Sequence, residues 1–169
     1  MSAVLPNNPR WRFWQRLGAL PWVVVLTRGL VGGVFVFAGF SKLLLPHAEV
    51  VALMQQYTVI PATITPWLAA LLPWLELASG TALVIGFYTT PAALLVGAQL
   101  VGFSMLMLLV IALGVPIEDC GCFGNLGLHE TPPQVLLRDL VLLVLLVPVL
   151  VRQRDVLALD AWGTRRTED

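Results

Sequence analysis

Cys120 and Cys122, the two cysteines of the chain, flank a single glycine in a glycine-rich stretch between two long apolar runs. Gly121 and Gly124 permit backbone angles that other residues avoid, so a turn can hold the two sulfurs close together. A disulfide across one residue requires the two Cα atoms to lie within about 4.4 to 6.8 Å, and strain makes such a bond easy to reduce. The pattern therefore favours reversible thiol–disulfide exchange over a static structural disulfide, which remains an alternative.

Exchange needs a thiolate, and nearby charges determine how readily one forms. Glu118 and Asp119 directly precede the cysteine pair. Repulsion between like charges would raise the pKa of the thiols beside them. Lys42 and Arg138, near the ends of two apolar runs, are the candidate cations that could approach and stabilise a thiolate.

Two thiolates also suit soft metal ions such as Cu(I) or Hg(II), but two ligands make an incomplete site. His47 and His129 show no recognisable ligand spacing, and each is better explained as an ordinary interfacial side chain. We therefore predict no metal site. Soft-metal transport is disfavoured because no predicted helix contains a cysteine, and Met105 and Met107 are too few to form a path.

Composition predicts a membrane protein, because 58% of the 169 residues are apolar and only 12% are charged. Crossing about 30 Å of hydrocarbon takes about 20 helical residues. Four apolar windows of suitable length run over residues 22–45, 67–88, 91–115 and 135–151. Lipid offers no partners to backbone amides, and the windows lack the alternation of a barrel strand. We therefore expect an all-α integral membrane four-helix bundle.

Local signals predict where two helices begin and where helices meet. Thr90 and Thr131 each precede a proline, which is typical of an N-cap followed by proline at the first helical position. Gly29 and Gly33 form a pair of small residues four apart, and Gly32 and Gly39 add further openings, so close helix contact is expected along this part of the first helix.

Arginines gather before the first window and after the fourth, at positions Arg10, Arg12, Arg16, Arg152, Arg154, Arg165 and Arg166. Positively charged segments are retained in the cytoplasm, so both termini are predicted to be cytoplasmic. An even number of crossings then places the cysteine loop on the outer face, where disulfides persist. We expect a multi-pass protein of the inner (cytoplasmic) membrane.

This topology divides the chain into three parts. Residues 1–20 form a cytoplasmic segment, in which Trp11 and Trp14 suit either a short interfacial helix or a frayed tail. Residues 21–151 form the four-helix transmembrane domain. Residues 152–169 form a polar cytoplasmic tail.

Charged residues inside the predicted spans are costly in lipid and usually face a partner or water. Arg28 in the first helix and Glu76 in the second are predicted to pair, and Gln99 in the third helix could join them. The group could simply fix how the helices pack. Alternatively, it could form a proton or quinone site linked to the cysteines, by analogy with other four-helix membrane thiol oxidoreductases.

The order of these features along the chain resembles that in the MauE family, within the wider DoxX-like group of redox-associated four-helix membrane proteins. The matching residues are Arg28, Gly39, Lys42, Tyr57, Pro61, Leu72-Pro73-Trp74-Leu75-Glu76, Gly80, Asp119-Cys120-Gly121-Cys122-Phe123-Gly124 and Leu137-Arg138-Asp139. The resemblance covers about residues 28 to 150. It implies thiol–disulfide processes outside the cytoplasm, including maturation of the disulfide-rich small subunit of methylamine dehydrogenase.

The sequence thus favours a membrane thiol–disulfide redox protein that exchanges with an extracytoplasmic thioredoxin-like or other cysteine-containing protein. Whether it acts as an enzyme, a thiol–disulfide oxidoreductase, stays open at this point. The main alternative is a non-catalytic membrane subunit that recruits or stabilises a partner complex. We expect contact with the lipid bilayer and no nucleic-acid partner, and leave open both oligomer formation and a quinone cofactor.

Overall fold

The computed structural model describes residues 20–57, 59–115 and 131–151, which contain five α-helices and no strand. The helices are α2 (Pro21–Leu43), α3 (His47–Gln55), α4 (Thr65–Ile85), α5 (Thr89–Ala112) and α6 (Pro132–Leu150). Four of them, α2, α4, α5 and α6, are long and apolar enough to cross a membrane. The predicted all-α architecture with four spans is therefore confirmed, and the short helix α3 is an addition to it.

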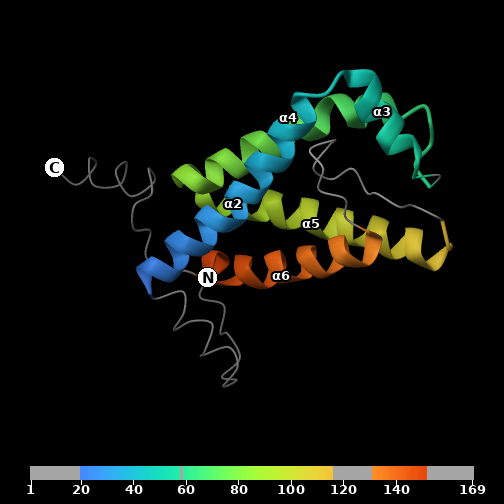
Figure 1. Cartoon of the computed structure of the whole chain (residues 1–169). Coiled ribbons are helices and arrows are strands. Elements are labelled where there is room, and N and C mark those ends of the chain that lie inside the picture. Colours follow the sequence, from blue (N-terminus) through green and yellow to red (C-terminus); the bar gives the residue numbers. More distant parts are fainter. Residues whose placement is uncertain (1–19, 58, 116–130, 152–169) are drawn as a thin grey trace, which may run out of the picture.

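The four long helices form two closely packed pairs, with α2 against α4 and α5 against α6 (Figure 1). Helix α3 packs on α4. It lies at the same end of the bundle as the end of α5 and the start of α6. We call this end, which also contains the last turn of α2, the α3 end.

Two glycines of α2 allow its close contact with α4. A Cβ atom added at Gly32 would lie 2.8 Å from the carbonyl oxygen of Gly80, and one added at Gly39 would lie 2.7 Å from that of Pro73. Real Cβ atoms do not approach backbone this closely, so any larger residue would push the helices apart. These contacts fix the position of α2 along α4.

The predicted close contact of α2 is confirmed at Gly32 and Gly39, but not at Gly29 and Gly33. A Cβ atom at Gly29 or Gly33 would meet nothing within 4 Å in the described structure, and both glycines are exposed. Gly32 and Gly39 lie on a different face of the same helix, and that face meets α4. Glycine spacing alone does not say which face of a helix its neighbour covers.

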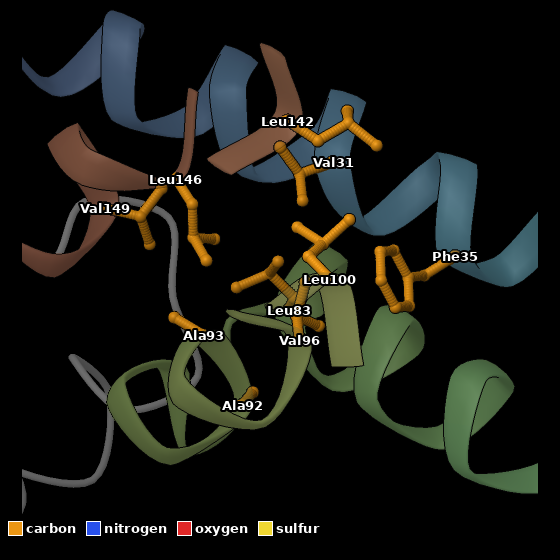
Figure 2. Close-up of a cluster of buried hydrophobic side chains, with 10 residues drawn as sticks. All are labelled: Val31, Phe35, Leu83, Ala92, Ala93, Val96, Leu100, Leu142, Leu146 and Val149. Carbon is orange, nitrogen blue, oxygen red and sulfur yellow. The ribbon is translucent and has the colours of Figure 1, made fainter. Parts of the chain in front are cut away.

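A cluster of buried apolar side chains joins the two helix pairs in the half of the bundle away from α3 (Figure 2). Its members are Val31, Phe35, Leu83, Ala92, Ala93, Val96, Leu100, Leu142, Leu146 and Val149. A second, smaller cluster at the α3 end consists of Tyr57, Met107, Val110 and Val135. Burial of these side chains from four helices and the α3–α4 link holds the two pairs together.

The two predicted N-caps have different outcomes. Thr131 is the N-cap of α6, and its backbone N–H donates to Oε1 of Gln134 at 3.0 Å, as in a capping box. The prediction for Thr90 was wrong, because α5 begins at Thr89 with Tyr88 as its N-cap. Tyr88 has a φ of 45°, so the short α4–α5 turn reverses the chain through a left-handed residue and the helix starts earlier.

Candidate functional site

A buried ion pair joins α2 to α4 near the α3 end. Nζ of Lys42 donates to Oε1 of Glu76 at 2.8 Å and to Oε2 at 2.7 Å. The two side chains are only 8% and 2% exposed. Lys42 reaches Glu76 because Gly39, almost one turn earlier, brings the helices together. A Cβ atom there would lie 3.2 Å from Cβ of Glu76.

The predicted pairing of Glu76 with Arg28 was wrong. The glycine contacts place Gly39 beside Glu76, and Arg28 lies eleven residues before Gly39 on the same helix. At 1.5 Å per residue this is about 16 Å along the axis, which is too far for the two side chains to bridge. Arg28 is itself buried on α2, with 2% of its surface exposed, but it lies far from the Glu76 carboxylate.

Gln99 of α5 lies beside this ion pair, across from α4. Its Nε2 donates to Oγ of Ser79 at 3.0 Å, and that hydroxyl donates to the backbone oxygen of Glu76 at 3.3 Å. Gln99 is 8% exposed, and its Oε1 accepts no hydrogen bond from the described residues. A buried amide oxygen in this state is an acceptor available to a ligand.

Helix α6 contributes a second pair of opposite charges. Nε and Nη2 of Arg138 lie 3.2 Å and 3.1 Å from Oδ1 of Asp139, and the carboxylate is almost fully buried. Sequence reasoning gave Asp139 no role. Its position next to an arginine, two turns into an otherwise apolar helix, was the signal that could have identified it.

These polar side chains line one cavity of about 330 Å³ between the two apolar clusters. Apolar side chains from all five described helices form most of its wall. The polar part is made by Lys42, Glu76, Gln99, Arg138 and Asp139. The sequence thus predicted four of these five residues as site candidates, but not that they face a common space.

Comparison with known proteins places this bundle in a family. The sequence family described as methylamine utilisation protein MauE matches residues 20–152, almost eight-tenths of the chain. The chain belongs to the MauE family. A relative, the methylamine utilization protein MauE of Paracoccus denitrificans, is 32% identical over 131 residues, covering 76% of this chain and 69% of the relative. No solved structure matches.

Family membership confirms the resemblance seen in the sequence, and together with the four apolar helices it identifies a multi-pass membrane protein. The matched range contains the cysteine segment as well as the four spans. The predicted division at residues 20 and 152 and the predicted side of each loop stay predictions.

The predicted redox pair, Cys120 and Cys122, lies outside the described residues, as do Glu118, Asp119 and His129. The segment that carries them connects α5 to α6 and so joins the MauE bundle at the α3 end. The two candidate cations, Lys42 and Arg138, are also at this end, and the structure shows that each contacts a carboxylate. His47 is exposed at the start of α3, with Nε2 3.2 Å from the backbone oxygen of Pro66.

Proposed function

We propose that this MauE-family protein is a membrane thiol–disulfide redox protein. It supports disulfide formation or maturation of an extracytoplasmic partner through Cys120 and Cys122. The observation that carries the proposal is the family match over residues 20–152, which includes the cysteine pair together with the whole bundle. The name of the Paracoccus relative supports a corresponding accessory role in methylamine utilisation for this chain.

The chemistry is a pair of exchange steps. A thiolate of the reduced partner attacks the Cys120–Cys122 disulfide, which forms a mixed disulfide and releases one cysteine as a thiolate. The second thiolate of the partner then attacks the mixed disulfide, so that the partner leaves oxidised and the cysteine pair remains as a dithiol. Run in reverse, the same steps reduce or rearrange a partner disulfide.

Arg138 is the better placed of the two candidate cations to stabilise a thiolate. Lys42 already directs two hydrogen bonds to Glu76, and its side chain is 8% exposed. The Arg138 side chain is 23% exposed at the α3 end. Because a guanidinium has five N–H groups, a partly exposed arginine can approach an exchanging sulfur while it keeps its contact with the buried Asp139.

Trapping of mixed disulfides tests the redox role. Cells that express Cys120→Ser, Cys122→Ser or the double variant are quenched with acid, alkylated and analysed under non-reducing conditions. We expect at least one single variant to accumulate an adduct that a reductant removes, because the resolving cysteine is missing. The double variant should form no such adduct.

A cysteine introduced elsewhere in the chain is the control for non-specific disulfide formation. Met105→Cys in the double-serine background puts a thiol on an exposed face of α5, where Met105 is 64% exposed. This variant should trap nothing. If neither single variant forms an adduct and the double variant still supports full maturation of the partner, the redox role is wrong and the non-catalytic subunit is the better explanation.

A further inference from the structure

The cavity at the α3 end has the form of a ligand site. Its volume of about 330 Å³ falls within the range of about 300 to 1,000 Å³ that is usual for pockets holding small molecules. Apolar side chains form most of the wall, and the polar ones gather on Lys42, Glu76, Gln99, Arg138 and Asp139. An amphipathic molecule, with a compact polar part and an apolar remainder, matches this division.

The charges around the cavity indicate an uncharged ligand. Lys42 and Arg138 supply two positive charges, and Glu76 and Asp139 supply two negative ones, so the wall has no formal net charge. Each cation also contacts one of the carboxylates. An anionic lipid headgroup or a fatty-acid carboxylate would therefore lose its hydration without gaining a countercharge.

The hydrogen-bonding groups indicate a ligand that carries oxygens. An ammonium group has three donors, and Lys42 directs two hydrogen bonds to Glu76, which leaves a donor for a carbonyl oxygen. Oε1 of Gln99, buried in the same wall and without a hydrogen bond from the described residues, can accept from a hydroxyl. A ligand whose carbonyl becomes a hydroxyl on reduction can accept from Lys42 when oxidised and donate to Gln99 when reduced.

Aromatic groups and the entrance add to this description. The ring of Phe103 lies with its centre 5.9 Å from Nζ of Lys42, and Phe35 also lines the cavity, so a flat ring would find aromatic neighbours beside the polar groups. Gly102 lines the cavity and is exposed on α5, a membrane-spanning helix. We therefore place the entrance of the cavity beside Gly102, on the lipid side.

We propose that this cavity binds a lipid-soluble quinone, with its carbonyl ring at the Lys42 and Gln99 end and its apolar tail along the remaining wall. The redox role of the bound quinone rests on the proposed thiol–disulfide function. Oxidation of the Cys120–Cys122 dithiol to a disulfide releases two electrons and two protons, and reduction of a quinone to a quinol takes up both. Binding of the quinone does not itself require the cysteines.

Binding of decylubiquinone to the full-length protein in phosphatidylcholine nanodiscs tests the proposal. We expect saturable binding of one quinone per chain above the partition into empty nanodiscs. Gly102→Phe fills the entrance without meeting backbone, since a Cβ there has nothing within 4 Å, and should weaken binding at least about tenfold. Gln99→Leu should weaken quinol binding about tenfold through loss of one buried hydrogen bond.

Two controls separate the possible causes of a loss. Gly33→Phe adds the same ring at an exposed glycine of α2 that does not line the cavity, and should bind the quinone like the unaltered protein. The Cys120→Ser/Cys122→Ser variant should also keep its binding. If the double-serine variant binds quinone but neither single cysteine variant traps a mixed disulfide, the proposed function fails and the binding site stands.

A photoreactive azidoquinone gives a second measurement, on the unaltered protein, if Gly102→Phe does not assemble. Cross-links should map to cavity residues of α4 and α5, such as Leu72 and Phe103, and excess decylubiquinone should abolish them. The proposal is overturned by the absence of saturable binding or by cross-links outside the cavity. It is equally overturned if oleate displaces the quinone one for one, since the cavity would then hold a fatty acid.

Discussion

The ammonium group of Lys42 donates to both carboxylate oxygens of Glu76, at 2.8 Å and 2.7 Å, across the contact between α2 and α4. Neither charge is tolerable in lipid without a partner, so the pair compensates two costly groups at once. It also forms part of the cavity wall. The same contact therefore connects the stability of the bundle to the site where we place a ligand.

Glu76→Gln should destabilise the protein by about 3 to 5 kcal/mol, because it leaves the buried Lys42 ammonium without a countercharge. Lys42→Met should cost a similar amount, since it leaves the carboxylate alone. Thermal unfolding of the purified protein in one detergent measures both variants.

The double variant Lys42→Met/Glu76→Leu is the matched control. It removes both charges and fills their space with apolar groups, so its stability should return close to that of the unaltered protein. If Glu76→Gln assembles and unfolds normally but loses thiol–disulfide activity, Glu76 acts in the chemistry and not in packing. Equal destabilisation of the double and single variants would contradict the ion-pair explanation.

Gly39→Ala should destabilise the α2–α4 contact by about 1 to 3 kcal/mol, the usual cost of adding atoms to a filled interface. The added Cβ would lie 2.7 Å from both the Pro73 oxygen and the Leu77 nitrogen, which are backbone atoms that cannot turn away. Gly33→Ala adds the same atom to the same helix where nothing lies within 4 Å. Unfolding curves that coincide for the two variants would show that the contact is not tight.

The spans could be predicted from the sequence because each is decided within its own residues. Four long apolar runs can satisfy their backbone groups in lipid only as helices, whatever surrounds them. The pairing of charged residues depends instead on how far one helix is shifted along another. That shift is set by Gly32 and Gly39 against α4, so Lys42 and not Arg28 reaches Glu76.

The site was predicted in part for the same reason. Lys42, Glu76, Gln99 and Arg138 stand out as polar residues in or beside apolar runs. The space between them arises from how two helix pairs pack against each other, and no single helix carries a signal for it. Asp139 was not predicted, because its burial depends on which side of α6 faces the other helices.

Labelling of the native cysteines tests the predicted orientation. After mild reduction of intact cells, a membrane-impermeant maleimide should label Cys120 and Cys122, because the predicted topology puts their loop outside the cytoplasmic membrane. The label is measured as a mass shift of the purified protein. Labelling only after the membrane is permeabilised would place the loop in the cytoplasm, where a lasting disulfide is not expected.

Two introduced cysteines extend this test to the ends of the bundle. Ala62 lies exposed at the α3 end, whereas Phe87 lies exposed in the α4–α5 turn, and α5 with its 24 residues separates the two ends by about 36 Å. In the double-serine background, Ala62→Cys should react with the impermeant maleimide in intact cells. Phe87→Cys should react only after permeabilisation. Since the two positions lie at opposite ends of the same helices, labelling of both in intact cells would contradict a bundle that spans the membrane. If Phe87→Cys reacts in intact cells and Ala62→Cys only after permeabilisation, the orientation is the inverse of the predicted one and the cavity lies in the cytoplasmic half.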